Sequence, residues 1–285
     1  MKIILSQFAG FCDGVRRAFE TVSNLDLESV KKPIYVLGSL VHNQDVVRKI
    51  EEKGIRKIDL EKFTNAKPGE IGTLIITAHG VGPQVYEMAK EKKIEIINTT
   101  CPRVIKVQRL AQVYIKCGYA IVLVGDKDHK EVRSILEWGE GKAMIVSNVE
   151  DLKNLNLEQA EKIIILSQTT QSKDFVEEVY NFIKNKFSAV EILDTICLAT
   201  DQRQDEIKKL AASHDAVVVI GSPESANSNR LFEIASSINP KTIFIQRAND
   251  MDEKWFSGVK SVSVTAGAST PNWIIEDVIA QLEKL

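Results

Sequence analysis

Short apolar runs recur along the whole chain, and each is followed by a polar stretch and a longer amphipathic segment. The runs are three to six residues long and lie at 3–5, 34–38, 73–77, 94–97, 120–125, 144–146, 163–166, 190–193, 216–221, 242–245 and 262–265. Continuous apolar runs of this length are typical of strands that are buried on both faces of a parallel sheet. We therefore predict a strand at each of these positions.

The segments between the runs carry apolar residues at helical spacing, with charged residues on the opposite side. Clear examples are residues 15–25, 84–93, 175–187 and 205–213. Regular alternation of strands with helices favours an α/β fold with right-handed crossovers. No long Pro-, Gly- or Ser-rich linker interrupts the alternation.

Many of the predicted strands end in unusually polar segments. Examples are TAHG at 77–80, GDKDHKE at 125–131 and TAGASTP at 265–271. In open α/β sheets, ligands bind outside the carboxyl ends of the strands. Because Cys, His, Thr, Ser and Asn gather at these ends, we expect the functional site there.

These polar segments repeat three times in the same order. Each repeat begins with a cysteine, with steps of 89 and 96 residues between successive members: Cys12, Cys101 and Cys197. A glycine that closes a strand follows, and four positions after it comes a polar residue: His42, His129 or Ser225. A later strand end carries the third member: His79, Thr169 or Ser269. The shared order, with glycines in register, indicates an internal repeat.

The repeat predicts three similar α/β units of ~95 residues each, a size within the usual range for small domains. We place the first unit at residues 14–97, the second at 98–193 and the third at 194–285, the last completed by residues 1–13. Arranged around a pseudo-threefold axis, the units would bring one cysteine each to a common centre.

Three converging thiolates could hold zinc or an iron–sulfur cluster. Three equivalent sulfurs around an axis do not favour a tetrahedral Cys₃His zinc site, so we favour a [4Fe–4S] cluster with one open iron. Such an iron could act as a Lewis acid toward a substrate oxygen, and the cluster could store an electron. Cys117 lies outside the repeat, before a strand, and we expect a small buried residue at a helix end.

The remaining polar residues at the strand ends are mostly neutral hydrogen-bond donors, without Lys or Arg among them. A ring of such donors suits a phosphate or another anion beside the metal. Its members are His42, His79, His129, Thr169, Ser225, Asn227 and Ser269. The fourth histidine, His214, follows a predicted helix, and we expect a structural role for it.

Glu131 is the one carboxylate beside these strand ends without an obvious basic partner on the next helical turn. Burial near a cluster would raise its pKa and allow it to deliver protons. A glutamate at a helix N-terminus is also favoured by the helix dipole alone. The spacing does not decide between these two interpretations.

The composition is that of an ordinary globular protein, with a net charge of −2. This charge provides no basic field for nucleic acid or acidic lipid. The N-terminal segment MKIILSQF has only three consecutive apolar residues, and no apolar stretch reaches the roughly 18–20 residues that span a bilayer. We therefore expect a cytoplasmic protein with no membrane or nucleic-acid partner.

Taken together, the motifs resemble the 4-hydroxy-3-methylbut-2-enyl diphosphate reductases, which complete the methylerythritol phosphate route to isoprenoids. The resemblance covers essentially the whole chain and rests on GFCDGVRRA, LVHN, TAHGV, TCPRVIKV, DHKEV, SQTT, DTIC, SANSNRL and TAGASTP. It implies a [4Fe–4S] cluster ligated by Cys12, Cys101 and Cys197. The substrate hydroxyl would bind the unique iron and leave as water after two electrons and protons have arrived.

The resemblance also implies roles for the polar residues. Glu131 would relay protons, with Thr169 assisting and positioning the hydroxyl, and His129 as a further catalytic residue. The diphosphate would be held by His42, His79, His129, Ser225, Asn227 and Ser269. Ferredoxin or flavodoxin would supply the electrons, which fits a chain without a convincing nucleotide or flavin motif.

Three positions depart from the usual pattern of this family. Lys130 replaces a proline, which should affect the helix start more than the chemistry. Ala226 replaces a serine and removes one hydroxyl from the anion ring. Gln108 replaces a histidine, away from the expected ligands. None of these positions is a cysteine or Glu131, so we expect activity to be retained.

Two alternatives stay open at this stage. A three-cysteine [4Fe–4S] lyase of the quinolinate synthase or aconitase type would act on carboxylates, for which we expect arginines at the strand ends. Arg103 and Arg230 lie just beyond those ends, and almost none lie nearer. A non-catalytic role, with a cluster or zinc as a structural pin or iron sensor, would not require Glu131.

Overall fold

The computed structural model describes residues 1–285 and contains three four-stranded sheets, all of them parallel. The eleven predicted strands all form, with ends shifted by at most one residue from the apolar runs. A twelfth strand, β3 (Arg56–Ile58), was not predicted, because it is a three-residue edge strand with only Ile58 buried. The prediction of three similar α/β units is confirmed.

The first two sheets share one strand order. The first consists of β2 (Ile34–Leu37), β3, β4 (Thr73–Ile76) and β5 (Glu95–Asn98), in the order β3-β2-β4-β5. The second consists of β6 (Ala120–Val124), β7 (Met144–Val146), β8 (Ile163–Ser167) and β9 (Val190–Ile192), in the order β7-β6-β8-β9. The repeat in the sequence therefore corresponds to a repeat in topology.

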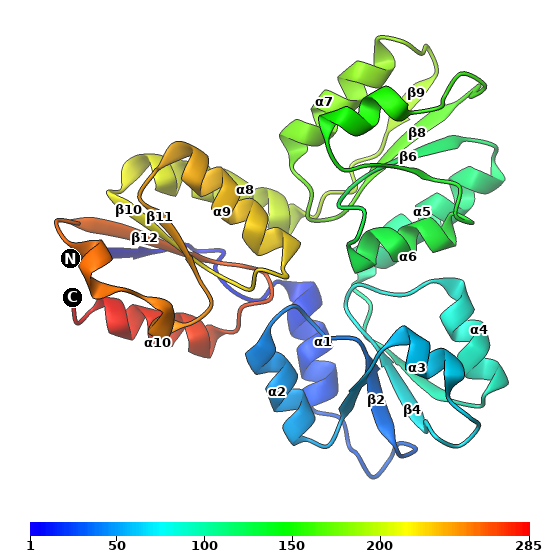
Figure 1. Ribbon diagram of the computed structural model, residues 1–285, viewed down its shortest axis with the longest axis horizontal. Helices are drawn as coiled ribbons and strands as arrows, with labels where there is room; N and C mark the ends of the chain where they lie inside the picture. The colour runs from blue at the N-terminus through cyan, green and yellow to red at the C-terminus, as the bar shows by residue number, and fades with distance from the viewer. The chain divides into compact units, whose positions relative to one another are not determined.

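The third sheet follows the same plan but takes its last strand from the other end of the chain. It consists of β10 (Ala216–Ile220), β11 (Thr242–Ile245), β12 (Ser261–Ala266) and the N-terminal β1 (Lys2–Leu5), in the order β11-β10-β12-β1. Lys2 to Leu5 pair in parallel with Ser261 to Val264. β1 thus occupies the place that β5 and β9 hold in the other sheets (Figure 1).

Ten α-helices connect the strands: α1 (Asp13–Ser23), α2 (Gln44–Glu52), α3 (Leu60–Asn65), α4 (Pro83–Glu91), α5 (Pro102–Lys116), α6 (Lys130–Trp138), α7 (Lys173–Lys184), α8 (Leu198–Ser213), α9 (Ala226–Ile238) and α10 (Asn272–Leu282). Three short 3₁₀ helices complete the fold: η1 (Val149–Asn154), η2 (Ala248–Asp250) and η3 (Glu253–Phe256). No helix combines the length and the apolar character that crossing a membrane requires.

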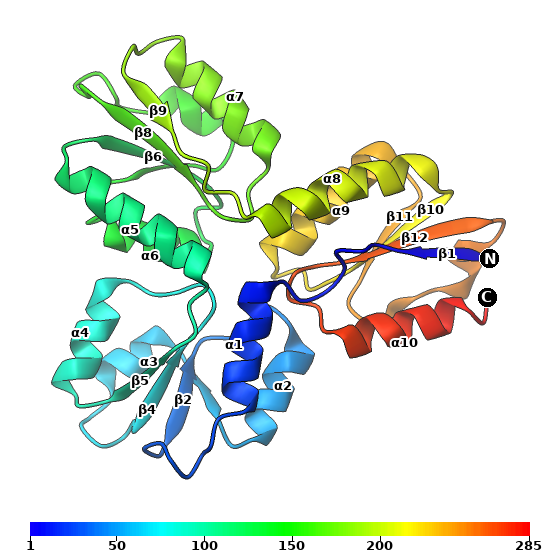
Figure 2. The same ribbon diagram turned by 180° about the vertical axis from the view of Figure 1, so that it is seen from behind.

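Two of the sheets are clearly covered by helices on both faces (Figures 1 and 2). In the second sheet, α5 and α6 pack on one face and α7 on the other. In the third sheet, α8 and α9 cover one face and α10 the other. The central strands β8 and β10 are buried at every residue. Each such Ile or Val side chain contributes roughly 1.5–3 kcal/mol on burial.

The chain forms two compact units. The terminal unit contains residues 1–16, 42–46 and 197–285, and includes the third sheet. The central unit contains residues 17–41 and 47–196, and includes the first two sheets. The finer division at residues 14–97, 98–193 and 194–285 with 1–13 stays a prediction.

Two expectations about residues outside the repeat have different outcomes. His214 ends α8, and its Nδ1 lies 3.0 Å from the carbonyl oxygen of Leu210, a local contact that agrees with a structural role. Cys117 ends α5 as expected but is exposed, so the prediction of burial was wrong. Gly118 follows it with a φ of 79°, the left-handed conformation that commonly ends a helix.

Candidate active site

Each of the three repeat cysteines lies immediately before a helix. Cys12 precedes α1, and Cys101 and Cys197 are the N-cap residues of α5 and α8. All three are partly buried, and none of the chain's cysteines forms a disulfide. A helix N-terminus stabilises negative charge and therefore favours the thiolate, which is the form that binds metal. The position is thus suited to metal ligation in all three repeats.

The terminal unit brings two of these cysteines together. Burial raises the pKa of the Cys12 thiol, and the neighbouring Cys197 raises it further, while the Arg203 guanidinium opposes both effects. Cys12 and Cys197 therefore lie close enough for electrostatic interaction between them. Cys101 belongs to the central unit, and its convergence with the other two stays a prediction.

Arg203 is a charged residue of the site that the sequence analysis missed. Only 5 % of it is exposed, and its guanidinium donates hydrogen bonds of 2.8 Å to the Gly10 carbonyl and 2.7 Å to the Ala199 carbonyl. The expectation of almost no arginine concerned the strand ends, and Arg203 does not contradict it, because it lies within helix α8.

Glu131 is buried in the central unit and bonded to Thr169 through both of its carboxyl oxygens. The Thr169 backbone N–H donates to Oε1 at 2.7 Å, and the Thr169 hydroxyl donates to Oε2 at 2.9 Å. Glu131 is 2 % exposed and lies in the first turn of α6. The two residues are 38 positions apart in sequence, and adjacent strand ends bring them together.

Burial raises the pKa of Glu131 to about 7, and the charge of Asp126 adds to this effect. The two hydrogen bonds from Thr169 act in the opposite direction, because they stabilise the carboxylate. The expectation of a raised pKa is confirmed. A carboxyl group that titrates near neutral pH can both give and take a proton, which is what a general acid requires.

The two histidines of the central unit form an edge-to-face pair. The ring centroids of His79 and His129 are 5.4 Å apart, with an angle of 83° between the rings. His129 is the N-cap of α6, and its Nδ1 accepts a hydrogen bond of 3.2 Å from the Glu131 backbone N–H. The histidine pair therefore lies directly beside the buried carboxyl group.

Gln108 and Ser134 support this arrangement from behind. The Gln108 amide donates to the Ser134 hydroxyl at 3.1 Å, and that hydroxyl lies 2.8 Å from the Glu131 carbonyl and 3.2 Å from the His79 carbonyl. As expected, Gln108 forms no direct hydrogen bond with the predicted ligands, but it is buried and is linked to His79 and Glu131 through Ser134.

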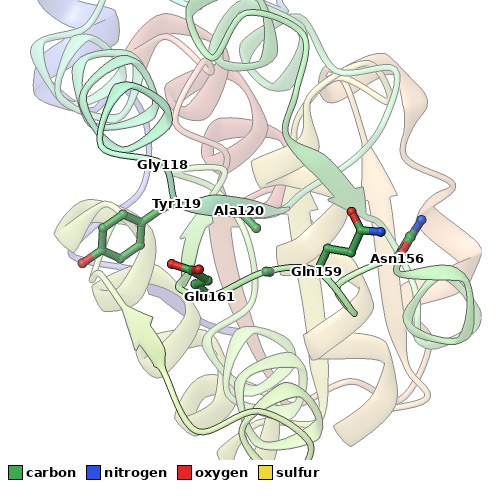
Figure 3. Close-up of a pocket in the computed structure, with 7 residues that line it drawn as sticks. Gly118, Tyr119, Ala120, Asn156, Gln159 and Glu161 are labelled. Carbon is green, nitrogen blue, oxygen red and sulfur yellow. The ribbon is translucent and has the colours of Figure 1, made fainter.

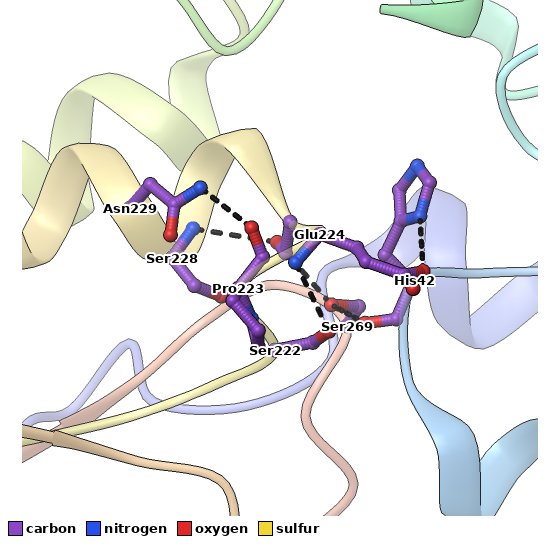
Figure 4. Close-up of polar contacts among 8 residues, drawn as sticks. His42, Ser222, Pro223, Glu224, Ser228, Asn229 and Ser269 are labelled. Atoms are coloured by element: carbon purple, nitrogen blue, oxygen red, sulfur yellow. Dashed lines mark hydrogen bonds and ion pairs between the residues drawn. The ribbon is translucent and has the colours of Figure 1, made fainter.

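The terminal unit holds a second group of predicted residues, shown in Figure 4. The Ser269 hydroxyl lies 3.2 Å from the His42 carbonyl and 3.5 Å from the Ser225 hydroxyl. Nδ1 of His42 is 3.6 Å from a carboxylate oxygen of Glu224, whose side chain is 66 % exposed. Because solvent screens that charge, Glu224 does not prevent an anion from binding nearby.

The N-terminus of α9 supplies further donors to this group. Ser225 caps the helix by accepting from the Ser228 backbone N–H at 3.3 Å. The Asn227 side-chain nitrogen is buried without a hydrogen-bond partner, although buried donors in proteins almost always have one. A helix N-terminus with an unused buried donor is a suitable site for an anion.

Two glycines allow the backbone to approach Ser228 closely. A Cβ atom at Gly221 or Gly267 would overlap the Ser228 hydroxyl. Both glycines close strands of the third sheet, at the ends of β10 and β12. A side chain at either position would therefore displace Ser228, which lies in the first turn of the helix that Ser225 caps.

A polar cavity of about 520 Å³ lies elsewhere in the central unit, lined by Gly118, Tyr119, Ala120, Asn156, Gln159, Ala160 and Glu161 (Figure 3). These residues precede β6 and β8, so the cavity opens at the amino ends of the strands. It contains none of the predicted site residues. Ligands of parallel sheets bind at the opposite end.

A signal in the sequence could have identified Arg203. It lies four and eight positions before Ile207 and Ala211, which are both buried on α8. Residues at this spacing share one helix face, so an arginine there must be buried. The contacts of Gln108, in contrast, depend on how α5 packs against α6, and no local pattern reveals them.

Comparison with known proteins identifies the family. The family described as LytB protein matches residues 3–283. Two curated relatives named 4-hydroxy-3-methylbut-2-enyl diphosphate reductase come from Pelobacter propionicus and Geotalea daltonii. They are 38 % and 40 % identical to the chain; the alignments cover 100 % of this chain and 99 % and 98 % of theirs.

Two solved structures resemble the chain over its full length. One, of E-1-hydroxy-2-methyl-but-2-enyl-4-diphosphate reductase from Plasmodium falciparum, is 35 % identical, with a TM-score of 0.91 over 99 % of this chain and 87 % of that one. The other, of (E)-4-hydroxy-3-methyl-but-2-enyl diphosphate reductase, described as the terminal enzyme of the non-mevalonate pathway, is 36 % identical. Its TM-score is 0.70, with complete coverage of both chains.

Proposed function

The chain belongs to the LytB protein family, and we propose that it reduces 4-hydroxy-3-methylbut-2-enyl diphosphate to isopentenyl diphosphate and dimethylallyl diphosphate. This is the last step of the methylerythritol phosphate route to isoprenoids. In the reaction, the C–O bond of the allylic alcohol breaks, two electrons and two protons are taken up, and water leaves. The diphosphate group is unchanged and serves as a handle for binding.

The observation that carries the proposal is the buried Glu131 carboxyl with its two hydrogen bonds from Thr169, in a chain related over its whole length to these reductases. We assign Glu131 as the general acid that supplies protons. Thr169 orients the carboxyl group and would contact the substrate hydroxyl. His129 fixes the first turn of α6 and so positions Glu131.

The cysteines fit an iron–sulfur group. They offer three thiols at helix N-termini, and the buried Arg203 guanidinium bonds to the carbonyls of Gly10 and Ala199, two residues from Cys12 and Cys197. Cys12, Cys101 and Cys197 would hold a [4Fe–4S] cluster, with the units arranged about a pseudo-threefold axis. When bound, the cluster supplies electrons to the substrate and a Lewis-acidic iron for its hydroxyl.

Neutral donors would hold the diphosphate. In the terminal unit these are His42, Ser225, Asn227 and Ser269, where the buried Asn227 nitrogen lacks a partner. In the central unit, His79 and His129 are the donors. Charge-assisted hydrogen bonds to phosphate oxygens are stronger than neutral ones, which suits a ring without Lys or Arg.

Ferredoxin or flavodoxin would deliver the electrons, and the reaction would take place in the cytoplasm, where thiols stay reduced. The two alternatives from the sequence receive no support. The relatives compared above are reductases and not carboxylate lyases. A structural pin would not require a buried carboxyl group that titrates near neutral pH.

Anaerobic purification followed by two measurements tests the proposal. We expect a coloured protein with about four irons per chain, which reduces the hydroxylated allylic diphosphate with dithionite-reduced methyl viologen as the electron donor. A folded but colourless and iron-free protein would exclude the cluster. An iron-loaded protein that leaves the diphosphate unreduced would exclude the reductase activity.

A further inference from the structure

Helix α5, which starts directly after Cys101, has an unusual charge. Its residues 102–116 include four basic side chains and no acidic one, in a chain whose net charge is −2. The basic residues are Arg103, Lys106, Arg109 and Lys116. The helix is thus a local positive feature on a slightly negative protein.

Apart from Lys116 in the last turn, this charge does not stabilise the helix. Arg103 lies in the first turn, where the helix dipole disfavours a cation by roughly 0.3–1 kcal/mol. Arg103, Lys106 and Arg109 are exposed and make no ion pair, unlike Lys142, which pairs with Glu140 at 2.7 Å. Because these side chains make no ion pair that stabilises the fold, their concentration on one face favours a role in binding a partner outside the chain.

The same face is partly apolar and hollowed. A shallow groove of about 460 Å³ is lined by Pro102, Ile105, Lys106, Arg109, Leu110 and Val113. Val113 is 53 % exposed, which is high for an apolar side chain on a packed helix. An apolar centre with a charged rim is the usual composition of a specific protein interface.

We propose that the groove face of α5 docks a small acidic electron-transfer protein, so that electrons enter beside Cys101. The proposal rests on the proposed function, because Cys101 must bind the cluster. The groove begins at the residue after Cys101 and extends roughly 17 Å along the helix, at about 1.5 Å per residue. Opposite charges steer such partners together, and a small interface allows them to separate after each transfer.

The redox balance is simple. The partner is oxidised by one electron in each encounter, and two encounters supply the two electrons of one turnover. The two protons come from solvent through Glu131, and the hydroxyl leaves as water. The α5 face takes no part in bond breaking, so a small soluble donor should not need it.

The experiment compares two electron donors on the intact iron-loaded enzyme. The test variant is the double charge reversal Lys106→Glu with Arg109→Glu. The matched control is Lys67→Glu with Lys153→Glu, two exposed lysines of the central unit outside α5. The donors are a reduced acidic flavodoxin, with a reduced acidic ferredoxin in parallel, and dithionite-reduced methyl viologen.

We expect the test variant to lose about tenfold or more in kcat/KM with the protein donors at low ionic strength, and less at high salt. Turnover with methyl viologen should stay within about twofold of the parent enzyme, and the control variant should keep both activities. A neutral pair, Lys106→Gln with Arg109→Gln, should give an intermediate loss with the protein donors.

Equal rates for parent and test variant with both protein donors would overturn the docking site. An equal loss with methyl viologen would also overturn it, because α5 would then act through the cluster or the fold. A parent enzyme that is inactive with every donor would instead contradict the proposed function itself.

In the terminal unit, a separate feature concerns the cysteine segments themselves. The Arg203 guanidinium bonds to the Gly10 carbonyl, two residues before Cys12, and to the Ala199 carbonyl, two residues after Cys197. Its Nε–H is buried without a hydrogen-bond partner. A buried cation normally requires an anionic partner, and both segments to which Arg203 is bonded carry a cysteine of the proposed cluster.

We infer that Arg203 is a positioning residue that ties the Cys12 and Cys197 segments together and favours the reduced state of the group they bind. A three-thiolate cluster becomes more negative on reduction, and a fixed positive charge nearby offsets that change. The inference concerns only Arg203 and the two cysteines of the terminal unit.

The test is a redox titration of the loaded protein followed by electron paramagnetic resonance. At a fixed potential, Arg203→Met should lower the ratio of reduced to oxidised cluster about tenfold, equivalent to about 59 mV for one electron. Arg203→Lys keeps the charge and should recover most of the shift. Lys209→Met, which removes an exposed charge from the same helix, should change nothing.

Iron content measured in parallel separates the two roles of Arg203. Loss of iron in both Arg203 variants, with an unchanged potential of the remaining cluster, would refute the electrostatic role. Arg203 would then act only through its hydrogen bonds to the backbone of the two cysteine segments. Full iron content together with an unchanged potential in Arg203→Met would overturn the inference as a whole.

Discussion

Replacement of Glu131 by glutamine tests the chemistry most directly, because it removes the titrating proton and little else. The amide has nearly the same shape as the carboxyl group, and its oxygen can still accept from the Thr169 backbone N–H, which bonds Oε1 at 2.7 Å. The Thr169 hydroxyl can rotate and accept from the new amide nitrogen. The fold and the cysteines should therefore be unaffected.

The structure sets the size of the effect. Burial raises the Glu131 pKa from 4.5 to about 7, which corresponds to roughly 3.4 kcal/mol in favour of the protonated form. At pH 7 about half of the molecules carry this proton, against roughly 0.3 % for a glutamate of ordinary pKa. Loss of a positioned general acid of this kind costs about 10²–10⁴-fold in turnover.

The assay is turnover with methyl viologen as a function of pH, combined with infrared difference spectra of the protonated carboxyl group. Because the acid must be protonated, parent turnover should fall as the pH rises through about 7. The Glu131→Gln variant should turn over slowly at every pH, and its rate should not show this fall as the pH rises. Glu137→Gln on the same helix is the matched control and should keep the parent profile, since Glu137 contacts none of the site residues.

Stability should change with pH in a defined direction. Because the folded-state pKa is raised, the folded chain binds more protons than the unfolded chain between pH 4.5 and about 7. This contribution to stability is present below pH 4.5 and is lost as the pH rises through about 7. Glu131→Gln should lack this loss and gain stability relative to the parent above pH 7. Full turnover of iron-loaded Glu131→Gln would refute the assignment of the general acid.

Three further variants test the surrounding groups. Thr169→Val should lower turnover about tenfold and shift the fall in rate to higher pH, because a hydrogen bond that lowers the carboxyl pKa is lost. Thr169→Ser should restore both the rate and the pH dependence, and pH–rate profiles of the two variants test this. Cys197→Ser should lose most of its iron, and Cys117→Ser none, in a colorimetric iron assay; equal retention would contradict the ligand assignment. Gly267→Ala should destabilise the fold by about 1–3 kcal/mol in urea unfolding, since the new methyl group overlaps the Ser228 hydroxyl, and an unchanged midpoint would contradict this packing.

The fold could be predicted closely because its signal is local. A buried parallel strand is recognisable from a run of β-branched residues, and strand ends deviated by no more than one residue. β3 was missed since its sequence, RKI, buries a single side chain. Its pairing with β2 through Tyr35, Val36 and Leu37 depends on tertiary packing and leaves no periodic trace.

The site was predictable in its residue types but not in its contacts. The repeat indicated Thr169, and Glu131 stood out as a carboxylate beside a strand end, yet the two hydrogen bonds between these residues, 38 positions apart, depend on how the ends of β6 and β8 meet. The same holds for Gln108, which reaches His79 only through Ser134. The residue pattern indicates which chemical groups are present, and the tertiary structure determines which atoms are in contact.

The pairing of β1 with β12 has a consequence for biogenesis. Strand β1 finds its neighbour only when residues 261–264 have been synthesised, so the sheet beside Cys12 closes late. Premature termination anywhere before β12 would leave an exposed strand edge and a cysteine loop without its scaffold. Cells should therefore load metal into this protein after translation is finished, and a nascent chain stalled before residue 261 should acquire no iron.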